Sequence, residues 1–105
     1  MLHYYTPNHS KELTPWHVDS SILTIAFPAA KEGLVGVLQN SFYLPEPILI
    51  DLEQCCSFND LIVFGGEKLE TLSNKQIKAF VHKVVNTNVE RYSAPFKYDI
   101  PFTIN

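Results

Sequence analysis

The chain has 105 residues and a mass of 12.0 kDa, which suffices for one hydrophobic core and not for two. Its hydrophobic content of 46% excludes a disordered chain, and its mean hydropathy of −0.01, without an apolar run near the ~20 residues of a spanning helix, excludes a membrane protein. The net charge of −3, with eight scattered basic residues, argues against nucleic acid as a partner.

Eight short segments rich in β-branched and aromatic residues predict strands. In chain order they are 2–5, 16–19, 22–27, 34–39, 48–52, 61–64, 78–85 and 92–96. Prolines and glycines separate them, and one short helical turn fits 67–72. Eight short strands in so short a chain close most economically as a sandwich or jelly roll. We therefore predict one all-β domain over residues 1–105.

Two features indicate a reducing compartment. The N-terminus lacks the basic start and apolar stretch of a signal peptide. Cys55 and Cys56 are adjacent, so a bridge between them would be strained, and we interpret both as free thiols. The expected compartment is the cytoplasm.

His17 and Asp19 form the first candidate site. On a strand, residues two apart point to the same side, so both side chains could hold one metal ion. A pair of this kind also arises by chance, and a surface or core pair with no ligand explains it equally well.

His82 is the candidate for a third ligand. Strand periodicity places it on one face with Phe80 and Val84, where a core histidine with a satisfied hydrogen bond is the more common case. Two imidazoles and one carboxylate on one face of an octahedral metal leave three positions open, as in non-haem Fe(II) oxygenases.

Arg91 is the only arginine in the chain, and Ser93 lies two residues after it. A planar guanidinium beside a hydroxyl group suits the binding of a carboxylate. A surface arginine beside a strand-end serine is the alternative interpretation.

The ordered motifs together resemble those of the 2-oxoglutarate/Fe(II)-dependent dioxygenases, with the isopenicillin N synthase-like group as the nearest branch. They are LHYYTP at 2–7, HVDSSILT at 17–24, GL at 33–34, VFGGEKLETLSN at 63–74, HKVV at 82–85 and RYS at 91–93. The resemblance implies a double-stranded β-helix, a cupin-like jelly roll of about eight short antiparallel strands. It also implies Fe(II) bound by His17, Asp19 and His82.

The same resemblance implies the co-substrate site and the reaction. The distal carboxylate of 2-oxoglutarate would meet Arg91 and Ser93, and Tyr5 would also touch the co-substrate. Dioxygen would oxidise a C–H bond of a small organic substrate, by hydroxylation or desaturation, while 2-oxoglutarate is split to succinate and carbon dioxide. The implied cofactors are Fe(II), 2-oxoglutarate and O2, with ascorbate as an optional addition.

The chain departs from the family pattern at His3, Phe64, Glu67, Lys75 and Lys83, none of which is an implied ligand. We also expect the N-terminal helical portion of the family to be missing. Exposed apolar surface, with self-association as the consequence, is then expected where that portion would pack.

Four alternatives to an active dioxygenase that oxidises a small molecule are considered. The chain could be a non-catalytic jelly-roll module that binds metal and 2-oxoglutarate, or a truncated inactive core. A cupin-type hydrolase or isomerase would not need Arg91 and Ser93. A nucleic-acid demethylase of the same superfamily would usually carry a further arginine downstream, which this chain does not have.

Overall fold

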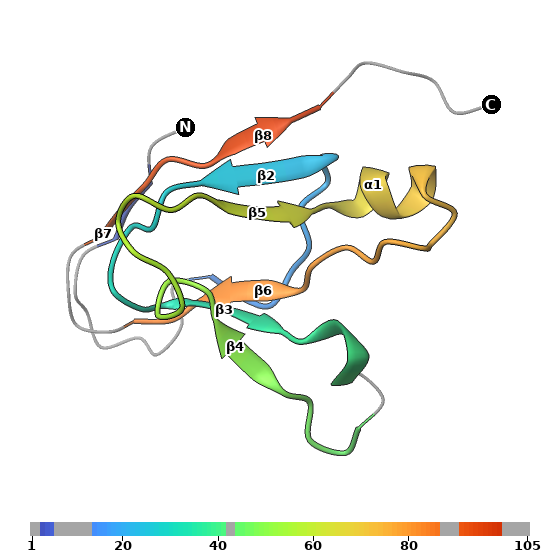
Figure 1. The fold of residues 1–105 in the computed structure, drawn as a ribbon, viewed down its shortest axis with the longest axis horizontal. Coiled ribbons are helices and arrows are strands. Elements are labelled where there is room, and N and C mark those ends of the chain that lie inside the picture. The colour runs from blue at the N-terminus through green and yellow to red at the C-terminus, as the bar shows by residue number, and fades with distance from the viewer. Residues whose placement is uncertain (1–2, 6–13, 42–43, 87–90, 100–105) are drawn as a thin grey trace.

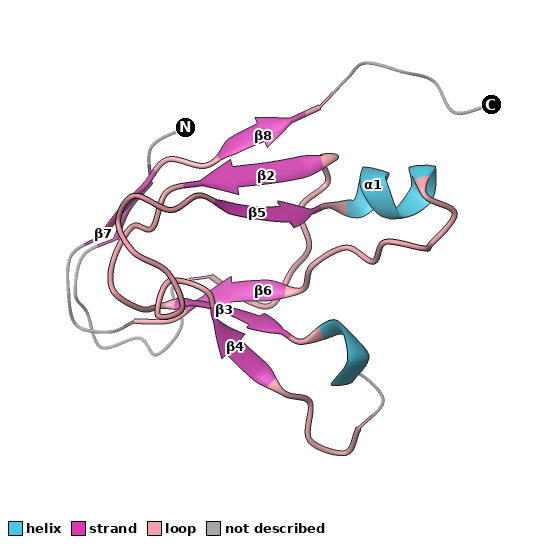
Figure 2. Ribbon diagram, viewed as in Figure 1, coloured by secondary structure: helices cyan, strands magenta, loops and turns pink. Residues whose placement is uncertain are grey.

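The computed structural model describes residues 3–5, 14–41, 44–86 and 91–99, and eight strands, one α-helix and one 3-10 helix lie in these segments (Figures 1 and 2). All strand pairs in them are antiparallel. The predicted all-β class is confirmed.

The first sheet has the strand order β5-β2-β8. Its central strand β2 (Leu23–Ala26) pairs with β5 (Ile62–Gly65) on one side and with β8 (Phe96–Tyr98) on the other. The register aligns Thr24 with Phe64 and with Lys97. Because directly opposed residues share a face, these three side chains form one row across the sheet.

The second sheet has the strand order β4-β3-β6. The strand β3 (Leu34–Val37) lies between β4 (Leu49–Asp51) and β6 (His82–Val84). Its register aligns Gly36 with His82. A further, two-stranded sheet pairs β1 (His3–Tyr5) with β7 (Arg91–Ser93).

The two three-stranded sheets lie in separate layers, with β8, β2 and β5 in one and β6, β3 and β4 in the other (Figure 1). The buried hydrophobic residues among those described are Ile22, Val37, Ile62 and Val84. The buried polar and charged residues are more numerous: Asp19, Ser21, Thr24, Ser41, Glu53, His82 and Arg91. Since burying polar groups is costly unless they are hydrogen-bonded, this set points to a functional interior.

The helix α1 (Glu67–Leu72) has the predicted bounds and fixes the loop before β2. Its first backbone N–H groups donate to that loop, from Glu67 to the Asp19 carbonyl at 2.8 Å and from Lys68 to the Ser21 carbonyl at 3.3 Å. Gly66 precedes the helix, and a Cβ atom there would overlap the same two carbonyl oxygens. This close approach requires glycine.

Three strand predictions need correction. Segment 16–19 is no strand: only His17 forms an isolated bridge, because the Asp19 carbonyl is bound to α1. Segment 92–96 is divided between β7 and β8, which lie in different sheets, because Pro95 between them has no N–H group for a ladder. Segment 78–85 shortens to β6, since the Ala79 N–H group donates to the Glu70 carboxylate instead of to a strand.

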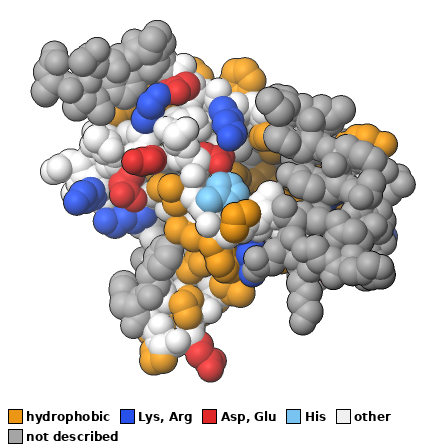
Figure 3. Space-filling view, turned by 180° about the vertical axis from the view of Figure 1, so that it is seen from behind, with side chains coloured by type: hydrophobic (Ala, Val, Ile, Leu, Met, Phe, Trp, Pro, Cys, Tyr) orange, Lys and Arg blue, Asp and Glu red, His pale blue; other side chains and the backbone are white. Residues whose placement is uncertain are grey.

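Large apolar side chains are exposed on the described surface, and apolar side chains form a band beside a histidine on the face shown in Figure 3. On the described surface, a groove of about 460 Å³ is lined by Trp16, Val37, Pro45, Glu46, Pro47, Leu49 and Val81. Both cysteines are free, as predicted. Among the described residues, no helix is long and apolar enough to cross a membrane.

Candidate metal centre

His17, Asp19 and His82 converge, with one ligand atom from each within 4.8 Å of the other two. The Nε2 atoms of both histidines lie 3.5 Å from Oδ1 of Asp19. Asp19 and His82 are buried, whereas the His17 side chain is 39% exposed. The three side chains therefore form a cluster that is open on the His17 side.

Backbone pairing explains why residues 65 positions apart meet. His17 and His82 form an antiparallel bridge in which each backbone N–H group donates to the other carbonyl at 3.0 Å. The imidazole rings consequently lie 4.3 Å apart between centroids. Asp19 reaches the same point because α1 binds its carbonyl. The prediction that the side chains of His17 and Asp19 point the same way holds although the segment is not a strand.

The histidine tautomers suit a metal. Nδ1 of His17 lies 2.8 Å from the Pro15 carbonyl oxygen, and Nδ1 of His82 lies 2.9 Å from the Phe80 carbonyl oxygen. A carbonyl oxygen only accepts, so each Nδ1 carries the proton and donates. With Nδ1 bound to a carbonyl, Nε2 is the ring atom that faces Asp19 and is left for a metal ion, which is the usual arrangement of metal-binding histidines.

The Asp19 carboxylate is fixed by its neighbours. The Thr24 hydroxyl group donates to Oδ2, which leaves Oδ1 directed toward the two imidazoles. The interaction with His82 is the main cause that holds the pKa of Asp19 well below its ordinary value of 3.8; burial opposes this effect, and the Thr24 hydrogen bond adds to it. The carboxylate is therefore ionised at neutral pH and is ready to bind a cation.

Aromatic rings enclose His82 on its buried side. The Phe80 ring lies almost parallel to the imidazole, at 10° and 5.7 Å between centroids. The Phe64 ring lies 4.6 Å from it at a steeper angle. These contacts fix the ring plane and keep water from this side of His82.

A cavity of about 210 Å³ adjoins the cluster between the two three-stranded sheets. One sheet contributes Thr24, Ala26, Phe64 and Lys97 to its lining, and the other contributes Leu34, His82 and Val84. Lys97 is the one basic residue in this lining among the described residues, and its Nζ atom lies 4.0 Å from Oδ1 of Asp19. A small organic molecule would meet an apolar space with polar groups at the metal end.

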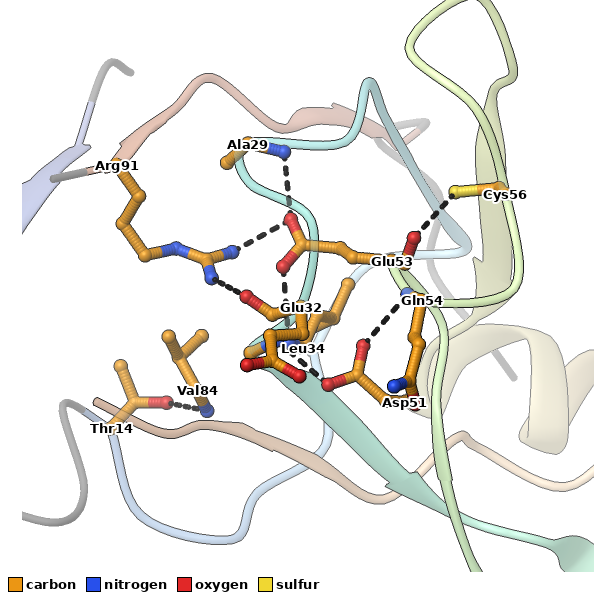
Figure 4. A network of polar contacts seen from close by, with 11 residues as sticks. Thr14, Ala29, Glu32, Leu34, Asp51, Glu53, Gln54, Cys56, Val84 and Arg91 are labelled. Carbon is orange, nitrogen blue, oxygen red and sulfur yellow. Dashed lines mark hydrogen bonds and ion pairs between the residues drawn. The ribbon is translucent and has the colours of Figure 1, made fainter. Parts of the chain in front are cut away.

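Arg91 does not line this cavity in the described structure. Its guanidinium is 2% exposed, and Nη2 donates to Oε2 of Glu53 at 2.8 Å while Nη1 donates to the Glu32 carbonyl at 3.2 Å (Figure 4). The sequence-predicted carboxylate site thus already holds a carboxylate, which belongs to the chain itself.

The two other predicted co-substrate residues are placed only by their backbones. Tyr5 lies directly opposite Arg91 in the pairing of β1 with β7, and Ser93 lies two residues further along β7. Their side chains lie outside the described part of the chain.

Three site residues were not predicted from the sequence. Thr24 and Lys97 lie in short segments whose other residues are mainly apolar or aromatic. This pattern only weakly indicates that their polar side chains line the cavity. Glu53 is one of 11 acidic residues, and its sequence context gives no sign of burial.

The donor set fits a divalent transition metal such as Fe(II). Two imidazole nitrogens and one carboxylate oxygen converge on one point, each backed by a hydrogen bond to its other polar atom. This is the two-histidine, one-carboxylate facial arrangement that leaves coordination positions open. The Arg91 guanidinium suits a carboxylate by its chemistry, although Glu53 already occupies its Nη2 donor.

The antiparallel sheets and the convergent ligands together define a jelly-roll protein with a facial metal site. The 2OG-Fe(II) oxygenase superfamily matches residues 1–100, and the chain belongs to this family.

Two plant proteins from Arabidopsis thaliana are similar in sequence. Protein DMR6-LIKE OXYGENASE 1 is 31% identical over 99 residues, and Protein DMR6-LIKE OXYGENASE 2 is 28% identical over 101 residues. The matches cover 90% and 92% of this chain and 26% of each relative. The chain therefore spans about a quarter of the length of these relatives.

Solved structures share the fold. A protein from Shewanella oneidensis has a TM-score of 0.76 at 18% identity, and the match covers 93% of this chain and 37% of the other. A full-length Neurospora crassa protein, in complex with alpha-KG, has a TM-score of 0.75 at 24% identity, and the match covers 93% of this chain and 32% of the other. The jelly-roll prediction is confirmed by these likenesses.

Proposed function

We propose that the chain is the core of an Fe(II)- and 2-oxoglutarate-dependent dioxygenase that oxidises a small organic molecule by hydroxylation or desaturation. The convergence of His17, Asp19 and His82 beside a cavity between the sheets carries the proposal. The Neurospora protein, which is also described in complex with thymine, supports a small-molecule substrate.

The proposed roles follow from the contacts. His17 and His82 offer Nε2 and Asp19 offers Oδ1, while Thr24 holds the second carboxylate oxygen away from the metal position. When bound, Fe(II) with 2-oxoglutarate and O2 supplies the oxidising chemistry, in which the co-substrate is split to succinate and carbon dioxide. Phe64 keeps water from the buried side of the site.

Arg91 is the proposed partner of the distal carboxylate, with Ser93 and Tyr5 beside it on β7 and β1. Arginine suits this role because its planar fork binds both oxygens of a carboxylate. The 2-oxo acid end of the co-substrate would then reach the metal.

The test is to titrate 2-oxoglutarate into the Mn(II)-loaded chain by calorimetry and to compare wild type with Arg91→Lys and Arg91→Ala. Removal of one partner of a desolvated charge pair costs roughly 2–5 kcal/mol, which is about 30-fold or more in affinity. We expect Arg91→Ala to weaken binding by this amount and Arg91→Lys by less, because lysine keeps the charge and loses the fork.

A 2-oxo monoacid without the distal carboxylate is the matched control ligand. Its affinity should be nearly the same for all three proteins. Equal weakening of both acids would show that Arg91 only supports the fold. A loss of 2-oxoglutarate affinity in Lys97→Met, with none in Arg91→Ala, would place the distal carboxylate on Lys97 instead.

A non-catalytic metal- and 2-oxoglutarate-binding module is the second candidate, because the three converging ligand atoms account for metal binding and do not by themselves require a reaction. Succinate formation from 2-oxoglutarate with Fe(II) and O2, present in wild type and absent in His82→Ala, would support the enzyme. Tight co-substrate binding without succinate would support the module.

A further inference from the structure

The buried ion pair between Arg91 and Glu53 is the least expected feature of the interior. The two side chains are 2% and 1% exposed, and they meet at 2.8 Å (Figure 4). A charge removed this far from water needs a partner, and each of these residues supplies the partner of the other.

Glu53 is held in place from more than one side. Oε2, which accepts from Arg91, also accepts from the Ala29 N–H group at 2.7 Å, and Oε1 accepts from the Leu34 N–H group at 3.1 Å. The Ala29 donor lies in the loop before β3, and the Leu34 donor belongs to the first residue of β3. The carboxylate therefore cannot leave Arg91 without losing two further hydrogen bonds.

Arg91 nevertheless keeps unused donor capacity. Its Nε atom is buried and has no hydrogen-bond partner in the described part of the chain. A buried donor without an acceptor is costly and rare in native proteins. Nε is thus the donor that a second carboxylate would use while Glu53 stays bound at Nη2.

We propose that Glu53 is the resident counterion of Arg91 and lowers the affinity of the site for a dicarboxylate. This inference rests on the proposed function, in which Arg91 binds the distal carboxylate of 2-oxoglutarate. Two carboxylates on one guanidinium repel each other, and Glu53 already provides the charge neutralisation that the co-substrate would otherwise supply. Glu53 thereby stabilises the unliganded fold and weakens co-substrate binding.

The experiment compares wild type with Glu53→Gln, which keeps the shape and removes the charge. Calorimetric titration of 2-oxoglutarate into the Mn(II)-loaded chain should show an affinity about tenfold or more above wild type, since like charges in contact repel strongly. The affinity for a 2-oxo monoacid should stay within about threefold. The melting temperature without ligand should fall, because Arg91 then lacks a charged partner.

Asp51→Asn is the matched control. Asp51 is a neighbouring acid on β4 whose oxygens accept from the backbone N–H groups of Gly33 and Gln54 rather than from Arg91. Its removal changes the charge equally and should leave the 2-oxoglutarate affinity at the wild-type value.

The outcomes distinguish the role of Glu53 from the proposed function. Unchanged or weaker 2-oxoglutarate binding in Glu53→Gln, while Arg91→Ala still weakens it, overturns the role of Glu53 and leaves the proposed function intact. If 2-oxoglutarate affinity is the same in Arg91→Ala as in wild type, both the role of Glu53 and the proposed role of Arg91 are overturned. If Glu53→Gln does not fold, Glu53→Asp decides: it withdraws the charge by one methylene, so its affinity should exceed that of wild type, and an equal or lower affinity overturns the proposal.

Discussion

At the scale of single residues, the metal site depends on hydrogen bonds to those polar atoms of His17, Asp19 and His82 that do not face the metal position. Two backbone carbonyls accept from the Nδ1 atoms of His17 and His82, and the Thr24 hydroxyl group donates to Asp19. Such supporting contacts orient the ligands, and their loss typically weakens metal binding by about 10- to 100-fold.

Thr24→Val tests this support directly. Valine keeps the shape and removes the donor, so Oδ2 of the Asp19 carboxylate loses its partner and the carboxylate can rotate. We expect Fe(II) affinity, measured anaerobically by equilibrium dialysis, to fall by about tenfold or more. Thr71→Val is the control, because the Thr71 hydroxyl group donates to the Glu67 carbonyl at the surface of α1. Equal Fe(II) affinity in Thr24→Val and Thr71→Val would show that Thr24 does not support the metal site.

The lowered pKa of Asp19 predicts a dependence of stability on pH in the metal-free chain. A carboxyl group whose pKa is lower in the folded state stabilises the fold above its ordinary pKa of 3.8 and loses this effect as pH falls through the folded-state value. The free energy of unfolding in urea should therefore be higher for wild type than for Asp19→Asn at pH 7. The difference should shrink only below about pH 4.

Asp60→Asn serves as the control for that experiment, because Asp60 accepts a hydrogen bond from the Ser57 N–H group in an exposed loop. A difference between wild type and Asp19→Asn that already disappears between about pH 7 and 5 would contradict the assigned environment of Asp19.

Residue spacing predicted part of this site. His17, Asp19 and His82 were candidates because their types and spacing suit a facial metal site, and the structure brings them together. Glu53 was not predictable, because its partner Arg91 is 38 residues away and only the fold makes them neighbours.

At the scale of elements, the centre of β3 carries a packing constraint for the site. Gly36 lies opposite His82, and a Cβ atom there would overlap the Phe80 ring, which stacks on the His82 imidazole. Gly36→Ala should therefore displace Phe80 and destabilise the fold by about 1–3 kcal/mol. Chemical denaturation measures this loss, and Fe(II) affinity should fall with it.

Gly65→Ala on β5 is the matched control. The nearest atom to its Cβ would be the end of the flexible Leu69 side chain at 3.0 Å, which can move aside. A loss of stability in Gly36→Ala no greater than that in Gly65→Ala would contradict the packing argument.

Element types were more predictable than element boundaries. The alternation of apolar residues and the turn residues predicted the approximate positions of most strands. The exceptions are segment 16–19, which forms only an isolated bridge, and segment 92–96, which is divided between two strands. The short helix was predicted with the bounds that it has in the structure. The corrections arise from partners distant in sequence, such as α1 for the Asp19 carbonyl, which no local pattern reveals.

At the scale of the whole molecule, the site exists because two three-stranded sheets face each other. The cavity takes residues from both sheets, while the ligands come from the bridge between His17 and β6 and from the loop that α1 fixes. Exposed apolar residues such as Trp16 and Leu49 surround a separate groove. Self-association through this surface stays a prediction, which sedimentation of the chain at rising concentration would test.

Anaerobic titration of the Fe(II)-loaded chain with 2-oxoglutarate tests the metal and co-substrate assignment most directly. Chelation of the metal by the 2-oxo acid end produces a metal-to-ligand charge-transfer band in the visible spectrum. We expect a saturable band with one iron per chain in wild type, and its loss in His17→Ala and His82→Ala while the circular dichroism of the β-sheets is retained. No band in wild type, or an equal band in both variants, would contradict the assignment of His17, Asp19 and His82 as the metal centre.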